Sequence, residues 1–96
     1  MQAQQKADEV KQKLEKIFLI GEAEGGKIKV TSNGNRIITA IEIDQSLLSL
    51  PDKEELEELV LVAVNKALEK AEDTHQSEMQ AVSQEMLGGL GGMFGQ

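Results

Sequence analysis

The chain has 96 residues and a formal net charge of −7 at pH 7, which indicates one acidic domain. It contains no cysteine and one histidine, His75, so the composition excludes a disulfide scaffold, a cysteine zinc site, a thiol nucleophile and a multi-histidine metal site within one chain. No nucleophile–base pattern is present, and we expect neither an enzyme nor a cofactor or metal. Since no apolar run reaches about 18 residues and no secretory leader is recognisable, we expect a cytoplasmic protein without a membrane span.

Residues 1 to about 18 are predicted to form an amphipathic helix. Its apolar positions alternate in steps of four and three residues, and the positions between them are glutamine, lysine or acid. A seam this narrow is typical of packing against another helix. The seam residues are Ala3, Ala7, Val10, Leu14 and Ile17.

The middle of the chain predicts a three-stranded antiparallel meander from residues 19–24, 27–32 and 36–44. Glycines punctuate the first turn, and Asn33-Gly34 is a strong hairpin signal because both residue types tolerate positive φ. In the third strand, strict alternation predicts that three isoleucines face the helices and that one faces the opposite side. The inward set is Ile37, Ile41 and Ile43, and the outward residue is Ile38.

A second helix is predicted from Lys53 to Leu87, since no glycine or proline interrupts this segment. Asp52 is the expected N-cap, with Glu55 completing a capping box. About 35 helical residues span roughly 50 Å, which exceeds a compact domain of this size, so one end must project.

The projecting end carries an apolar stripe that includes Met79, Val82 and Met86. A monomer would expose this stripe, so we expect it to pack against the first helix and a second copy of the chain. His75 lies on the same stripe and is interpreted as a packing histidine, the alternative being a pH sensor or a ligand at a dimer axis.

The predicted organisation is therefore a single domain of residues 1–87 and a flexible tail of residues 88–96, which contains five glycines in nine residues. Charge divides unevenly along this domain. Residues 1–36 hold seven basic and five acidic residues, whereas residues 37–96 hold three basic and twelve acidic ones. The net acidity argues against simple capture of nucleic acid, but it resides mainly in the second helix and its approach.

Several segments in order resemble the YbaB/EbfC family of nucleoid-associated DNA-binding proteins. They are Gln2-Ala3-Gln4-Gln5, Gly21-Glu22-Ala23-Glu24-Gly25-Gly26, Lys29-Val30-Thr31 with Asn33-Gly34, Ile41-Glu42-Ile43-Asp44, and Ala63-Val64-Asn65-Lys66-Ala67. The resemblance implies an α+β protomer of order α-β-β-β-α that forms a tweezer-like homodimer. It also implies binding to double-stranded DNA and a role in nucleoid organisation or gene regulation.

This resemblance attributes DNA contacts mainly to the projecting helices and carries no catalytic motif. The matching positions are the lysines Lys6, Lys11, Lys13 and Lys16, with Lys66 and Lys70 as further candidates. Neither a membrane nor a small-molecule substrate is expected as a partner. The alternative function is an acidic adaptor that grips a protein partner with its projecting helices and its tail.

Overall fold

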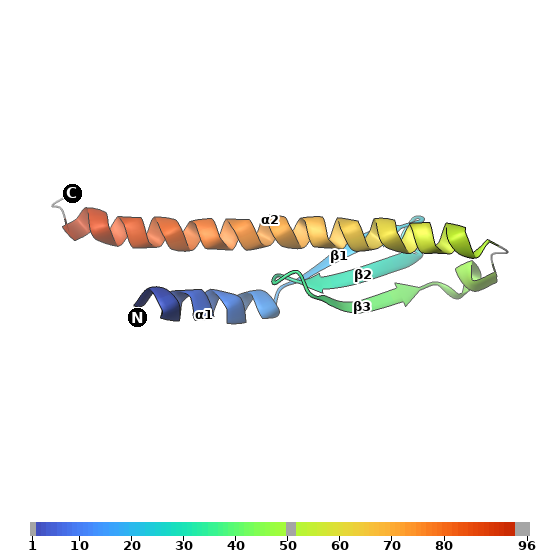
Figure 1. Cartoon of the computed structure of the whole chain (residues 1–96), viewed down its shortest axis with the longest axis horizontal. Helices are drawn as coiled ribbons and strands as arrows, with labels where there is room; N and C mark the ends of the chain where they lie inside the picture. The colour runs from blue at the N-terminus through green and yellow to red at the C-terminus, as the bar shows by residue number, and fades with distance from the viewer. Residues whose placement is uncertain (1, 50–51, 94–96) are drawn as a thin grey trace.

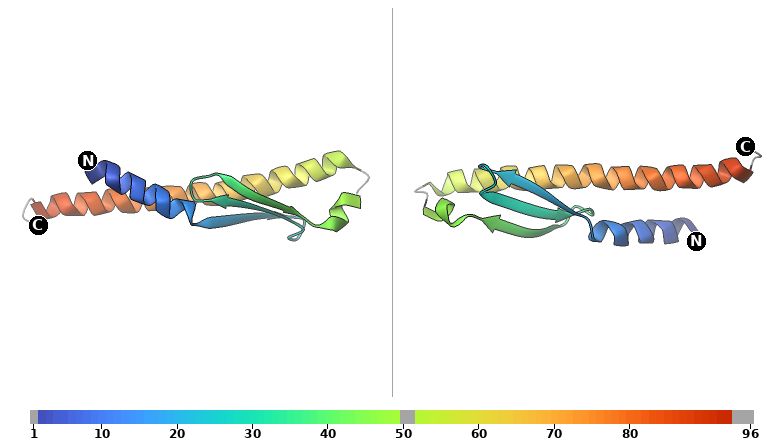
Figure 2. Two further views of the ribbon diagram at one scale, coloured as in Figure 1. Left: turned by 90° about the horizontal axis from the view of Figure 1, so that it is seen from below. Right: turned by 180° about the vertical axis from the view of Figure 1, so that it is seen from behind.

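The computed structural model describes residues 2–49 and 52–93, with side chains for residues 7–49 and 52–85. The fold is elongated, with extents of 68 × 20 × 16 Å, and α2 runs along nearly its whole length (Figure 1). The sheet and α1 follow one another along the same side of α2 (Figures 1 and 2). The elements are α1 (Gln2–Glu15), β1 (Phe18–Ala23), β2 (Ile28–Asn33), β3 (Ile38–Ile43), the 3₁₀ helix η1 (Gln45–Ser49) and α2 (Lys53–Met93).

The predicted α-β-β-β-α order and the antiparallel meander are confirmed, with strand order β1-β2-β3. The core forms where α2 packs on β1 and β2, and η1 closes its end with Leu47. Across the described part of the chain, we find no helix with the length and apolar character that a membrane span requires.

The core contact between β1 and α2 depends on small residues. The side chains of Ala63, Ala67 and Ala71 are completely buried on α2. Gly21 of β1 lies directly over them, and a Cβ atom there would sit 2.2 Å from the Ala63 carbonyl oxygen and 2.4 Å from the Ala67 nitrogen. The strand backbone therefore reaches the helix backbone at a distance that only glycine permits.

A β-bulge changes which isoleucines of β3 face the core. Thr31 pairs with Ala40 but Ser32 pairs with Ile38, so Thr39 is the extra residue. As a result Ile38 packs against the core, while Ile37 is 57% exposed, so the prediction exchanged these two. Ile43 packs against the core as expected. Ile41 pairs with the buried Val30, but it is 50% exposed because α2 covers β1 and β2 rather than β3.

Both helix ends differ from the predicted ones. The first helix ends at Glu15, three residues early, because the next residues form tighter turns before Phe18 pairs with Asn33. The second helix continues through four glycines to Met93, beyond the predicted end at Leu87. Glycine disfavours a helix by about 1 kcal/mol but does not terminate one. The predicted flexible tail thus overlaps α2 over residues 88–93, and residues 94–96 lie outside the described part.

Candidate nucleic-acid interface

The first helix is seated by two apolar residues. Leu14 is fully buried and Val10 is 7% exposed, while the polar positions described between them are exposed. Gly34 of the β2–β3 turn lies against Leu14, and its N–H donates to the Leu14 carbonyl oxygen at 2.8 Å. Val10 and Leu14 of the predicted seam therefore face the rest of the fold, whereas Ala7 is exposed and Lys11 lies on the exposed surface of α1.

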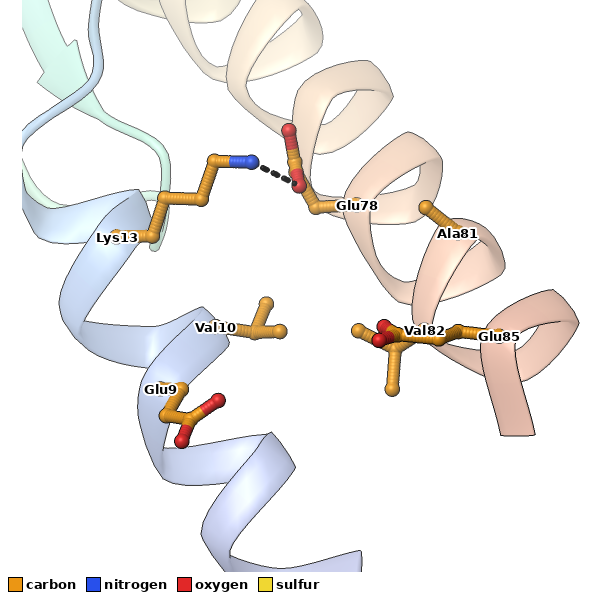
Figure 3. Close-up of a pocket in the computed structure, with 7 residues that line it drawn as sticks. All are labelled: Glu9, Val10, Lys13, Glu78, Ala81, Val82 and Glu85. Carbon is orange, nitrogen blue, oxygen red and sulfur yellow. Dashed lines mark hydrogen bonds and ion pairs between the residues drawn. The ribbon is translucent and has the colours of Figure 1, made fainter. Parts of the chain in front are cut away.

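One predicted DNA-binding lysine is engaged within the protein. Lys13 Nζ lies 3.0 Å from Glu78 Oε2, and this ion pair bridges α1 and α2 (Figure 3). Below it, Val10 and Val82 point toward each other across a groove of about 260 Å³. The groove residues are Glu9, Val10, Lys13, Glu78, Ala81, Val82 and Glu85, so its polar lining is mainly acidic.

Lys70 is engaged as well, because its Nζ donates to the Ile20 carbonyl oxygen of β1 at 2.7 Å. In contrast, Lys11, Lys16 and Lys66 are exposed and make no side-chain hydrogen bond or ion pair within the described residues. Lys6 belongs to α1, but its side chain lies outside the described part. The structure thus divides the six predicted positions into two with internal partners, three without them and one undescribed.

Sequence reasoning omitted Arg36, which lies in the turn between β2 and β3. Its Nη1 atom is 2.6 Å from Glu72 Oε2 of α2. This hydrogen bond from Arg36 is the main reason why the pKa of Glu72 is lowered, with Gln76 and His75 adding smaller effects. The only sequence signal for this residue is its position three after Asn33, where the third strand was predicted to begin.

Exposed apolar side chains gather on the sheet. Phe18 and Ile20 of β1 alternate with the inward Gly21 and Ala23, so they lie on the sheet face away from α2. Phe18 is 59% and Ile20 is 44% exposed. We call Phe18, Ile20 and Ile37 the exposed apolar set. A protein that remained monomeric would leave these side chains in water.

The projecting half of α2 carries the half-buried residues His75, Met79 and Val82. The packing role of His75 stays a prediction, whereas Val10 of α1 lies opposite Val82, as predicted for this stripe (Figure 3). The side chain of Met86 lies outside the described part. Among the residues with described side chains, no three histidine or acidic residues form a group that could hold a metal ion.

Comparisons with known proteins agree with this architecture. The YbaB/EbfC DNA-binding family matches residues 1–86. A nucleoid-associated protein, Cphamn1_1179 from Chlorobium phaeobacteroides, is 42% identical over 92% of this chain and 78% of its own length. A nucleoid-associated protein from Flavobacterium johnsoniae is 35% identical over 96% and 85%. The crystal structure of the uncharacterized protein HP0035 from Helicobacter pylori supports the fold, with a TM-score of 0.68 and 23% identity over 78% of this chain and 87% of that one.

Proposed function

Since the chain belongs to the YbaB/EbfC DNA-binding family, we propose that it binds double-stranded DNA as a homodimer and acts in nucleoid organisation or gene regulation. The contacts we propose are made mainly by Lys6 and Lys11 of α1 and by Lys16, which directly follows its last residue, and we call these three the α1 lysines. The observation that carries this proposal is the exposure of Lys11 and Lys16, which lack partners among the described residues. A lysine without an internal partner can approach a phosphate without first breaking an ion pair.

We expect the six candidate lysines to contribute unequally to DNA affinity. Lys11 and Lys16 contribute most, and Lys6 and Lys66 follow as proposed contacts. Lys13 and Lys70 contribute less, because each already has an internal partner at 3.0 Å or closer. The engaged lysines help to seat α1 and β1 on α2, and thus they support the geometry of the site.

The acidity of the chain is compatible with this proposal when its placement is considered. Five carboxylates lie near the start of α2, beginning with the N-cap Asp52, and three more line the groove between the helices. We propose that DNA meets the α1 lysines while the acidic start of α2, at the other end of the molecule, points away (Figure 1). Binding is then led by phosphate contacts, depends on salt and has little sequence preference.

Self-association is supported by the exposed apolar set, whose three side chains are between 44% and 59% exposed in the protomer. Sedimentation of the purified protein tests it, and a monomer at micromolar concentration would reject the homodimer. We propose that the two protomers form a tweezer-like pair, with the projecting helices as the arms.

DNA binding is tested by gel shifts with duplex DNA over a salt series. Lys6, Lys11, Lys16 and Lys66 in each of two protomers give at most about eight phosphate contacts, so log K against log salt should have a slope no steeper than about −7. Changing Lys11→Gln with Lys16→Gln removes about four of these contacts. We expect an affinity loss of at least about tenfold near 100 mM salt and a slope flatter by about 3.5.

The matched control is Lys27→Gln with Lys53→Gln, which removes the same charge near the start of α2. This control should leave the slope close to that of the wild-type protein. An equal loss in both double variants would show that net charge, rather than α1, controls binding. Unchanged affinity in the α1 variant would reject Lys11 and Lys16 as contacts.

A further inference from the structure

The β2–β3 turn, residues 33–36, lies where α1 passes beside α2. Asn35 Nδ2 donates to the Lys11 carbonyl oxygen at 3.0 Å, and the Gly34 N–H donates to the Leu14 carbonyl oxygen. Two successive turn residues therefore hold carbonyl groups near the C-terminal end of α1. The Leu14 carbonyl is one of the last four of α1, and it accepts the Ile17 N–H at 3.2 Å as well.

The same turn also holds α2. Arg36 pairs with Glu72, whose other carboxylate oxygen accepts a hydrogen bond from Gln76 Nε2 at 3.0 Å. Glu72 follows Ala71, the last buried alanine of the core, so this contact marks the point where α2 leaves the sheet. The turn thus connects both helices where their projecting parts begin.

Hydrogen bonds within the turn and one unusual backbone angle fix the shape that allows these contacts. The Asn33 side-chain oxygen accepts from the backbone N–H groups of Asn35 and Ile37 at 2.8 and 3.3 Å. Arg36 adopts a φ of 65°, which is uncommon for a residue other than glycine. Sequence reasoning placed positive φ at Asn33-Gly34, but in the structure Arg36 has this conformation, and Gly34 serves to pass close to Leu14.

We propose that Asn35 and Arg36 are positioning residues that set the direction of α1 relative to α2 and so place the α1 lysines on DNA. This inference rests on the proposed DNA binding by α1. The turn acts through the helices. Asn35 donates to the Lys11 carbonyl oxygen and Arg36 pairs with Glu72, so both side chains contact the helices rather than a ligand.

Breaking the Arg36–Glu72 pair from the α2 side separates this role from direct phosphate contact by Arg36. In Glu72→Gln, the chain loses a negative charge, so a direct contact by Arg36 would bind DNA unchanged or more tightly. The positioning role predicts weaker binding, by about threefold, which is the factor that an exposed ion pair supplies. The matched control is Glu69→Gln, an exposed glutamate of α2 without a described partner, which should not weaken binding.

The second readout is the distance between α1 and α2, which is measured in the absence of DNA. The chain has no cysteine, so cysteines placed at the exposed Gln12 and Gln80 can carry spin labels, with excess unlabelled protein to suppress distances between protomers. Glu72→Gln combined with Asn35→Ala should broaden the distance distribution. The charge exchange Arg36→Glu with Glu72→Arg should narrow the distribution again and recover most of the affinity.

An unchanged distance distribution in the combined variant overturns the proposal, as does unchanged or tighter DNA binding by Glu72→Gln. A wild-type protein that fails to bind DNA rejects the proposed function instead. In that case a broadened distribution still establishes that the turn sets the helix direction. Thermal unfolding of each variant distinguishes a shift of the helices from loss of the fold.

Discussion

The two halves of α2 are held in different ways. Over residues 53–71 the helix lies on β1 and β2, where three alanines are fully buried and a glycine backbone touches the helix backbone. Over residues 72–85 its described partners are Arg36 of the β2–β3 turn, Lys13 of α1, and Val10 of α1 across an open groove. The first half is fixed by close backbone contact, whereas the described part of the second is held by two ion pairs and by the apolar contact of α1 beside it.

The largest expected effect tests the fixed half. Gly21→Ala places a Cβ 2.2 Å from the Ala63 carbonyl oxygen, and neither backbone can yield without moving the core. We expect a loss of at least about 3 kcal/mol in the free energy of unfolding, measured by chemical denaturation. Gly25→Ala is the control, because its Cβ meets open space and only its φ of 64° causes strain. If Gly25→Ala lowers the free energy of unfolding as much as Gly21→Ala, the close approach of Gly21 to α2 is not the cause of the loss.

The next effect concerns the seat of α1. Leu14→Ala removes a fully buried side chain that packs under Gly34, and we expect a loss of about 2 to 4 kcal/mol. Amide hydrogen exchange should rise mainly in α1 and in residues 75–85, while residues 59–71 keep their protection. Equal loss of protection along the whole of α2 would show that the two halves unfold as one unit.

A smaller effect is expected at the start of the fixed half, where the predicted N-cap is confirmed. Asp52 Oδ1 accepts a hydrogen bond from the Glu54 N–H at 2.9 Å. Asp52→Ala should lower the free energy of unfolding by about 1 kcal/mol. Asp52→Ser should retain most of the stability of the wild-type protein, because serine is also a good N-cap. If serine and alanine cost the same, the cap is not the source of the effect.

The smallest effect is a pH dependence at the boundary between the halves. Because Arg36 lowers the pKa of Glu72, the pair contributes stability above the ordinary glutamate pKa, about 4.3, and this contribution is lost as pH falls through the lowered value. Carboxyl NMR titration should show a higher Glu72 midpoint in Arg36→Ala than in the wild-type protein. Identical midpoints would mean that the pair does not persist in solution.

Local patterns predicted much of this fold. The apolar seam located α1, β-branched runs located the strands, and Asp52 marked the start of α2. Strict alternation predicted the wrong faces for Ile37 and Ile38 because a bulge at Thr39 adds one residue to the strand. No residue type in this segment predicts that bulge. The contact of Gly21 with α2 was also missed, since sequence reasoning assigns a glycine before a turn to that turn.

The candidate site was predictable only as a set of lysines. Lys13 meets Glu78 and Lys70 meets Ile20 across 65 and 50 positions of sequence, so their partners follow from tertiary structure alone. Arg36 went unnoticed for the same reason, because Glu72 lies 36 positions away. Periodicity gives the side of a helix on which a charge lies, but not what faces that side.

The alanines and Gly21 that join α2 to the sheet have a further consequence. Alanine and glycine side chains have no rotamers to lose, so this contact forms with little side-chain conformational entropy cost. For the same reason it cannot repack in response to a partner. Any adjustment to a partner must therefore come from parts of the protein outside this contact.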